Sequence, residues 1–207
     1  MNRTISHKLL CLQAIIRPEH VAIGGAVFTR WGRTTCPEEA DLVYAGIVGG
    51  SLFSNHGGGA NYLCLPSDPE WSVNDEGVGK SANIYGAEYK QESSFSKANA
   101  HGQSIVNHNV PCAACVSRTR VSALMIPART SCYAGWTAEY SGHLMVAHFG
   151  HQGRTQFICV DGAPEVDEAG YRPEESAHLY LVGGVCGSLP CPAYINNRGL
   201  TCVLCTK

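Results

Sequence analysis

The feature that most constrains this chain is its cysteine content, 11 cysteines in 207 residues. Cytosolic proteins keep thiols reduced, whereas so many cysteines are typical of chains that fold in an oxidising compartment. The length suits one domain, or two small ones that share a core. An odd count leaves at least one thiol outside any fully paired set. The cysteines are Cys11, Cys36, Cys64, Cys112, Cys115, Cys132, Cys159, Cys186, Cys191, Cys202 and Cys205.

The spacing and context of the two C-x-x-C motifs distinguish three possible roles for these cysteines: disulfide bonding, zinc binding and redox catalysis. Structural zinc sites gather paired ligands within a compact loop, but Cys112/Cys115 and Cys202/Cys205 lie far apart. A thioredoxin-like redox site needs a helix after its C-x-x-C, whereas residues 116–126 have the composition of a strand. We therefore expect a disulfide framework, and a zinc or redox protein using these motifs is the lowest-ranked alternative. No cofactor is expected.

The pairing of the cysteines is only partly fixed by their spacing. A bridge within one C-x-x-C is strained, so each cysteine of the two motifs is expected to bond a different partner. The remaining connectivity is open. Cys11 lies in an N-terminal stretch whose texture differs from the rest, so we expect it to be the surplus thiol, either free or paired between chains. The other ten cysteines suffice for five bridges.

Charge and hydropathy argue against two classes of partner. The formal net charge is −2 and the sequence pI about 6.5, so the chain lacks the excess of positive charge that nucleic acid attracts. No apolar run approaches the ~20 residues that span a bilayer, and we expect no membrane insertion. Residues 1–23 contain a short apolar run without a small-residue cleavage site, which is not a convincing signal peptide.

Short strand-like runs dominate the rest of the chain. They are rich in β-branched and aromatic residues and are separated by clusters of Gly, Pro, Asn and Asp. We therefore expect a mainly β, disulfide-stapled globular domain with long loops. A faint echo between residues 44–52 and 180–189 is explained either by two related halves or by chance similarity of Gly-rich strand ends. The expected strands are residues 26–31, 42–45, 61–65, 116–126, 144–149, 155–160, 177–182 and 200–205.

Several longer motifs occur together in a recognisable order. They are FTRWGRTTCP (28–37), VYAG (43–46), GGGANYLCLP (57–66), YGAEY (85–89), NHNVPCAACVSRTR (107–120), LMIPART (124–130), GWTAEYSGHLM (135–145), FICVD (157–161) and CPAYINNRGLTCVLCTK (191–207). This set resembles the globular C-terminal domain of the short-chain, spongin-type collagens of marine invertebrates and their collagen-free relatives. More distantly, it is similar to the non-collagenous domain of basement-membrane collagen.

The resemblance covers residues 24–207 and leaves residues 1–23 as an N-terminal extension. It implies an extracellular, cystine-rich, non-enzymatic domain. The chain departs from the collagenous members because it has no Gly-X-Y repeat, which a triple helix requires. A fibre-forming role is therefore in doubt, and the globular module is expected to act alone.

Two segments carry the chemistry of a sugar site, in which an aromatic face stacks on a pyranose and planar polar groups hold its hydroxyls. The second segment surrounds a glycine turn at residues 57–59, where a ligand can approach the backbone. The candidates are Trp136, Glu139, Tyr140, His143, His148, His151 and Arg154 in the first segment, and Asn55, His56 and Asn61 in the second.

The histidines of the first segment also raise the question of a metal. On a strand, His148 and His151 would point to opposite faces unless Gly150 turns the chain, and no carboxylate or thiolate recurs at zinc-like spacing. We expect no metal. No hydrolase, metalloprotease, phosphate-loop or dinucleotide motif is present either, and we expect no enzyme.

Together these features predict a secreted recognition module that binds carbohydrate, as a lectin does. Its expected partners are glycans or matrix glycoproteins, and a homo-oligomer is expected because weak sugar sites gain avidity by repetition. The alternative, from a different functional class, is a structural or assembly domain of the extracellular matrix.

Overall fold

The computed structural model describes residues 24–71, 82–90, 104–171 and 175–207 of the chain. These ranges contain strands and no α-helix, which confirms the mainly β prediction. The strands are β1 (Val27–Trp31), β2 (Ala40–Gly50), β3 (Leu63–Pro66), β4 (Tyr85–Tyr89), β5 (His108–Asn109), β6 (Pro111–Ser117), β7 (Ala123–Pro127), β8 (Thr137–Val146), β9 (Ile158–Asp161), β10 (Asp167–Tyr171), β11 (Ala177–Leu181) and β12 (Thr201–Thr206).

Each predicted strand overlaps an observed one, but several boundaries differ. Residues 116–126 are not one strand, because the chain reverses between β6 and β7, where the amides of Val121 and Ser122 both donate to the Lys207 carbonyl. The strand expected at 144–149 is the end of β8, which stops at Val146, and the following residues turn. The strands β4, β5 and β10 were not predicted from the sequence. The prediction that Cys11 is surplus lies outside the described residues.

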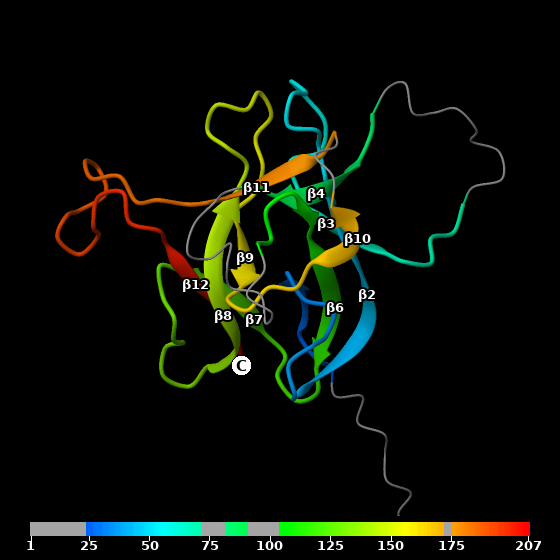
Figure 1. The fold of residues 1–207 in the computed structure, drawn as a ribbon. Coiled ribbons are helices and arrows are strands. Elements are labelled where there is room, and N and C mark those ends of the chain that lie inside the picture. The colour runs from blue at the N-terminus through cyan, green and yellow to red at the C-terminus, as the bar shows by residue number, and fades with distance from the viewer. Residues whose placement is uncertain (1–23, 72–81, 91–103, 172–174) are drawn as a thin grey trace, which may run out of the picture.

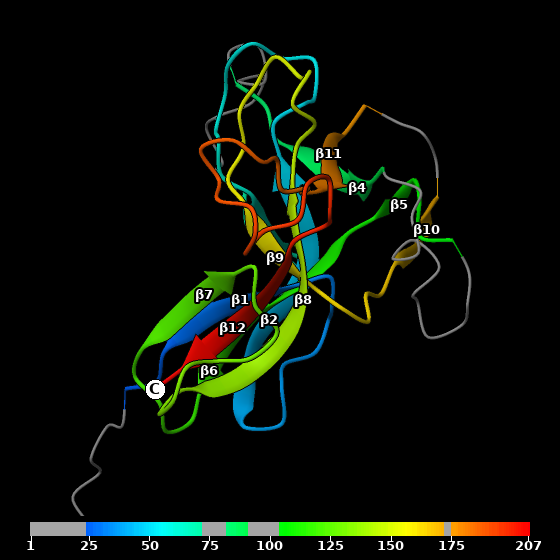
Figure 2. The same ribbon diagram turned by 90° about the vertical axis from the view of Figure 1, so that its left-hand side faces the viewer.

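The two halves of the chain repeat one topology. In the first half, β2 pairs antiparallel with β3, β4 and β6, and β1 pairs antiparallel with β6. In the second half, β8 pairs antiparallel with β9, β11 and β12, and β7 pairs antiparallel with β12. The strands β1, β2, β3, β4 and β6 therefore correspond to β7, β8, β9, β11 and β12 (Figures 1 and 2).

Equivalent side chains make equivalent contacts in the two halves. The hydroxyl of Tyr44 donates to the Cys64 carbonyl, and the hydroxyl of Tyr140 donates to the Cys159 carbonyl, each at 3.0 Å. These bonds join the second and third strands of each half. The repetition thus extends from topology to individual hydrogen bonds.

One glycine in each half allows two neighbouring strands to approach closely at the same place. A Cβ atom on Gly46 would lie 1.7 Å from the Leu65 carbonyl oxygen, and one on Gly142 would lie 1.8 Å from that of Val160. Any larger residue would push apart the pair β2–β3 or β8–β9. The echo between residues 44–52 and 180–189 is therefore not the repeat, because it aligns β2 with β11 rather than with β8.

Five disulfides hold this duplicated frame, and the prediction that each C-x-x-C cysteine bonds a different partner is confirmed. In each half, the two cysteines on β6 or β12 bond two cysteines earlier in that half, in a nested pattern. A short fifth bridge closes a loop between β11 and β12. The bridges are Cys36–Cys115, Cys64–Cys112, Cys132–Cys205, Cys159–Cys202 and Cys186–Cys191.

This bonding bears on the zinc and redox alternative. All ten cysteines of the described ranges are in disulfides, so neither C-x-x-C motif offers a free dithiol. The five bridges also place the protein in an oxidising environment, because cytosolic reductants keep such thiols reduced.

The halves share one sheet and one interior. β1 lies parallel to β9 through Trp31 and Val160, and β4 lies parallel to β11. The largest buried cluster draws on both halves, with Val48 and Tyr89 from the first and Met145 and Leu179 from the second. The main core is therefore shared, and a small cluster of Ile126, Val203 and Cys205 lies within the second half alone.

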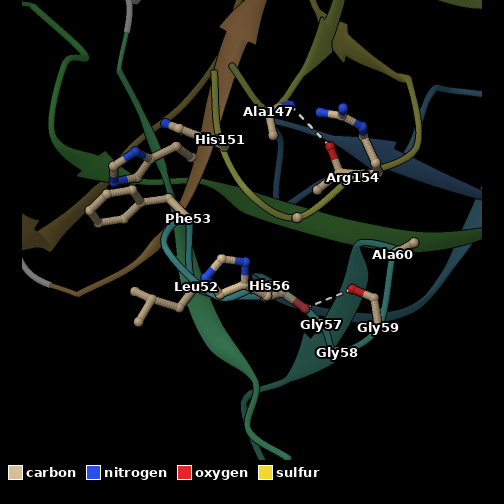
Figure 3. A pocket seen from close by; sticks show the side chains of 14 residues that line it. Leu52, Phe53, His56, Gly57, Gly58, Gly59, Ala60, Ala147, His151 and Arg154 are labelled. Atoms are coloured by element: carbon tan, nitrogen blue, oxygen red, sulfur yellow. Dashed lines mark hydrogen bonds between the residues drawn. The ribbon is translucent and has the colours of Figure 1, made fainter. Parts of the chain in front are cut away.

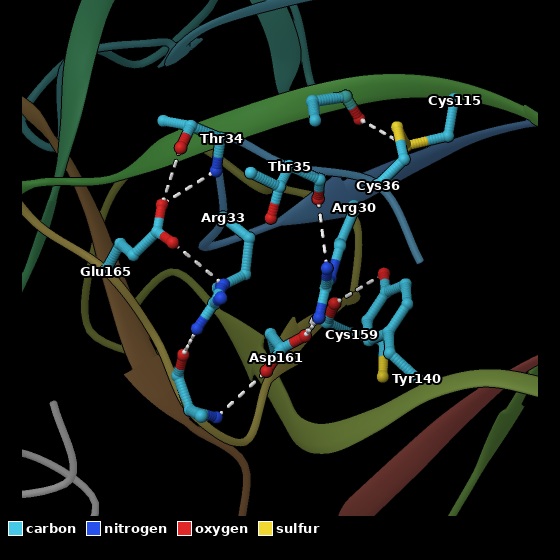
Figure 4. A network of polar contacts seen from close by, with 12 residues as sticks. Arg30, Arg33, Thr34, Thr35, Cys36, Cys115, Tyr140, Cys159, Asp161 and Glu165 are labelled. Atoms are coloured by element: carbon cyan, nitrogen blue, oxygen red, sulfur yellow. Dashed lines mark hydrogen bonds and ion pairs between the residues drawn. A yellow bond between two sulfur atoms is a disulfide. The ribbon is translucent and has the colours of Figure 1, made fainter. Parts of the chain in front are cut away.

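Polar and charged groups on and just after β1 and β9 also join the two halves (Figure 4). The Arg30 guanidinium lies 2.7 Å from the Asp161 carboxylate, with both side chains largely buried. The Thr34 hydroxyl donates to the Glu165 carboxylate at 2.7 Å. A charge-assisted pair at this depth fixes the relative position of β1 and β9.

The bridges predict a graded loss of stability. Chain-entropy reasoning assigns about 4 kcal/mol to a bridge that spans 43 residues and about 2 kcal/mol to one that spans 5. Replacing Cys159 and Cys202 together by Ala should therefore lower the free energy of unfolding about twice as much as replacing Cys186 and Cys191. Urea unfolding of the two variants measures this, and an equal loss in both would contradict it.

Candidate functional site

A cavity of about 230 Å³ lies between two loops, one from each half. The first loop joins β2 to β3 and the second joins β8 to β9, so they are equivalent in the repeat. Figures 1 and 2 show both loops side by side at one end of the molecule. The cavity is lined by residues 51–53 and 56–60, by Ala147, His151, Gly153, Arg154 and Thr155, and by His178 of β11.

Hydrogen bonds hold the two loops against each other and against β11. The Gln156 amide donates to the Ala60 carbonyl at 3.0 Å, which joins the loops directly. The Phe53 amide donates to the Ser176 carbonyl, and the Tyr62 hydroxyl donates to the His178 carbonyl. The cavity walls are therefore set by the frame rather than by one loop alone.

A glycine turn forms one wall (Figure 3). The Ser51 hydroxyl donates to the Gly59 carbonyl at 2.7 Å, which closes the turn. Gly58 has φ +112°, a conformation that L side chains rarely adopt. A Cβ on Gly57 or Gly59 would meet no atom within 4 Å, so the backbone of this turn is open to a ligand.

Phe53 and two histidines form the other wall. The Phe53 ring stacks on His178, with 4.3 Å between centroids and an interplanar angle of 8°. His151 lies 5.3 Å from each of these rings. Phe53 is still 38% exposed, so part of its ring remains available for an apolar ligand face. Figure 3 shows Phe53 and His151 on one side of the cavity and Arg154 on the other.

Two further rings, those of His148 and Tyr180, pack against His151. His148 lies 5.5 Å from His151 and 5.1 Å from Tyr180, measured between centroids. His148 and His151 do not point to opposite faces, because β8 ends at Val146 and the chain turns at Gly150, the exception that the sequence left open; the Gly150 amide donates to His148 Nδ1. A strand's alternation does not extend past its end.

Among the described residues, Arg154 is the one permanently charged side chain in the lining of the cavity. Its lining includes three histidines and Arg154 but neither Asp nor Glu. Burial lowers the pKa of His178 to about 4, and Lys90 and His151 add to this effect. Burial and the neighbouring His148 lower the pKa of His151. The unliganded site therefore resists protonation of both rings near neutral pH.

Three of the ten predicted sugar ligands, His56, His151 and Arg154, line the cavity, and His148 packs against His151. Asn55 lines a neighbouring hollow of about 390 Å³ that also includes His56. Asn61 is exposed but does not line the cavity. The two segments singled out in the sequence thus contribute to one place, although they lie in different halves.

The other predicted ligands serve the scaffold. Tyr140 is buried and donates to the Thr29 and Cys159 carbonyls. Trp136 packs on the cluster around Val203. His143 is half-buried in the middle of β8, opposite Val160 and Thr201.

Glu139 is likewise part of the frame. Its side chain is 2% exposed and lies 2.7 Å from the Arg120 guanidinium, while the Thr206 hydroxyl donates to the same oxygen. Hydrogen bonds to Glu139 and Glu39 hold the pKa of Arg120 above its ordinary value. This carboxylate is buried and already bonded, so it is not available to a sugar hydroxyl.

The sequence did not point to Phe53 or His178. Phe53 is a single aromatic residue among Ser and Asn, and His178 lies in the ordinary strand pattern AHLYL. Only the parallel placement of β11 beside β4 brings His178 to the glycine turn. No local pattern in either segment predicts this contact.

A second cavity, of about 490 Å³, lies between residues 126–133 and 193–201. It also contains aromatic and cationic groups, but the Arg129 guanidinium already covers the Tyr133 ring at 4.4 Å from its centroid. The intramolecular cation–π contact engages one face of that ring together with the Arg129 charge. The first cavity is the stronger candidate because it brings together predicted sugar ligands from two loops.

Neither a metal-binding cluster nor a membrane-spanning helix is found in the described ranges. No group of three or more His, Cys, Asp and Glu side chains there is placed to hold a metal ion. The same part of the chain contains no helix long and apolar enough to cross a membrane.

A scan against protein-family models finds no match, and a search of curated proteins finds no relative. The use of the first cavity must therefore be argued from its geometry.

The buried Glu139–Arg120 pair yields a prediction about stability. Glu139→Ala removes a buried charged acceptor from Arg120 and Thr206, while Arg120 keeps its ion pair with Glu39. A lost hydrogen bond to a charged group costs about 1.5–3 kcal/mol, so the free energy of unfolding should fall by about 2 kcal/mol. The control is Asp41→Ala, which breaks the exposed pair between Asp41 (58% exposed) and Arg118 (55% exposed) and should change the stability far less, because solvent screens an exposed pair. Urea unfolding compares them, and equal losses would refute the assignment.

Proposed function

We propose that this protein is a secreted, non-enzymatic recognition module that binds carbohydrate, in the manner of a lectin, at the cavity between the β2–β3 and β8–β9 loops. The observation that carries the proposal is the pairing of a partly exposed aromatic ring, Phe53, with planar polar groups across a small cavity. Sugars need both, because one face of a pyranose is apolar while its rim is a ring of hydroxyls.

The polar groups are suited to hydroxyls. Imidazole and guanidinium groups are planar and directional donors, and His56, His151 and Arg154 supply them from two loops. The open backbone at Gly57 and Gly59 offers further amide and carbonyl groups without side chains in the way. Recognition by fixed groups of this kind requires no movement of the frame.

The cavity is small. Its volume of about 230 Å³ lies below the ~300–1,000 Å³ of pockets for drug-sized ligands. It is suited to one terminal sugar ring rather than to a long chain. A site of this size binds weakly, and repetition in a homo-oligomer would supply avidity on a surface of glycans or matrix glycoproteins.

Secretion and the absence of catalysis are parts of the same proposal. The five bridges are in keeping with an extracellular location, where such frameworks persist. Ten cysteines are bonded and so cannot act as nucleophiles. The rigid disulfide frame around a preformed cavity supports binding rather than turnover.

A glycan array tests the proposal. The wild-type protein should bind a defined set of saccharides, and Phe53→Ala should abolish most of that signal because the stacking face is lost. The control is Phe149→Ala, at the equivalent place in the other loop, which is 90% exposed and does not line the cavity.

Retained binding in Phe53→Ala, or equal loss in both variants, would refute the proposed site. A blank array together with high-order assembly in size-exclusion chromatography would refute carbohydrate binding and favour the matrix assembly role.

A further inference from the structure

We propose that the saccharide bound in this cavity is acidic, carrying a sulfate or carboxylate group that is held by Arg154 and the histidines. This inference rests on the proposed function and names the class of ligand. The shared chemistry is an anionic group on a sugar ring. Phe53 would contact the sugar ring, and Arg154, on the other side of the cavity (Figure 3), would contact the anion.

The charge of the lining is the first argument. The chain as a whole has a net charge of −2, yet the cavity contains Arg154 and three histidines without a carboxylate. The positive charge of Arg154 therefore has no carboxylate among the described lining residues to balance it. A neutral sugar would leave the Arg154 charge unmatched, whereas a sulfate or carboxylate forms charge-assisted hydrogen bonds with it.

The surroundings of the imidazoles are the second argument. The Nδ1 atoms of His151 and His178 are shielded from solvent, and neither has a hydrogen-bond partner in the described ranges. No described carboxylate or carbonyl therefore bonds to either Nδ1 atom. An anion in the cavity would act on the two rings through its charge, because the Nδ1 atoms themselves are shielded from the cavity.

Among the described residues, Lys90 and Glu88 are the charged side chains that bear most directly on His178. Lys90, which follows β4, lowers the pKa of His178. Glu88 of β4 pairs in register with His178, and its carboxylate binds the Lys90 ammonium. The His151 and Tyr180 rings also pack near His178. Lys90 and Glu88 thus balance each other, and Arg154 is the charge in the lining that an anion would match.

The proposal implies that binding takes up protons. An anion raises the pKa of both histidines in the complex above the lowered values of the free protein. A ligand that raises a pKa binds more tightly as pH falls, fully so below the free pKa, which for His178 is about 4. The gain disappears as pH rises through the pKa of the complex. Affinity should change up to about tenfold for each unit by which a pKa is raised.

The experiment compares matched ligands by isothermal titration calorimetry. A sulfated oligosaccharide is set against its desulfated form, a uronic-acid oligosaccharide against its carboxyl-reduced form, and inorganic sulfate is the third arm. Titrations run at several pH values from 8 to 5. The acidic member of at least one pair should bind at least about tenfold more tightly, with affinity rising as pH falls.

Two variants assign the effect to the cavity. Arg154→Gln should weaken binding of the acidic saccharide at every pH, because the permanent charge is lost. His151→Gln should flatten the pH dependence, because one titrating group is lost. Arg198→Gln, in the second cavity, is the matched control and should bind as wild type does.

The outcomes separate the two proposals. Equal binding of the acidic and neutral members of each pair, or an affinity that does not depend on pH, overturns the acidic ligand and leaves carbohydrate binding intact. Binding of inorganic sulfate as tightly as of the sulfated sugar supports the anion site and overturns the carbohydrate. No binding in any arm overturns both.

Discussion

The structure depends on one covalent pattern used twice, a strand whose two cysteines are fastened to two earlier segments of the same half. On β6, Cys112 bonds Cys64 at the start of β3, and on β12, Cys202 bonds Cys159 at the start of β9. Each of these bridges therefore fixes the end of the loop that lines the cavity. Ordering two long loops costs conformational entropy, and bridges at their ends reduce that cost. The cavity is preformed for this reason.

The duplication separates the frame from the function. The tyrosine hydroxyls, the close-packed glycines and the nested bridges recur in both halves because each half must hold the same strands together. The two loops differ, since one contributes Phe53 and a glycine turn while the other contributes His151 and Arg154. A site between unlike loops on a repeated frame recognises an asymmetric ligand. This is what a sugar with one apolar face and one charged substituent requires.

The sequence predicted the features that follow from local chemistry. The cysteine count and the strain within C-x-x-C predicted the disulfide framework and its avoidance of adjacent pairing, and composition predicted the β class. The candidate site was predicted only in part, because residues adjacent in sequence were assumed to act together. Tyr140 and Glu139 lie on β8 and serve the frame, whereas His151 and Arg154 lie beyond its end and face the other half. His178 reaches the cavity only through strand pairing, which no local pattern encodes.

The central claim is that a ligand binds between two loops that belong to different halves. Amide hydrogen exchange with and without a saturating acidic saccharide measures this most directly, because a bound ligand slows local opening where it makes contact. We predict slowed exchange in residues 51–60 and 147–155 together, with residues 193–201 unchanged. Protection of residues 193–201 without either of the two loops would contradict the account.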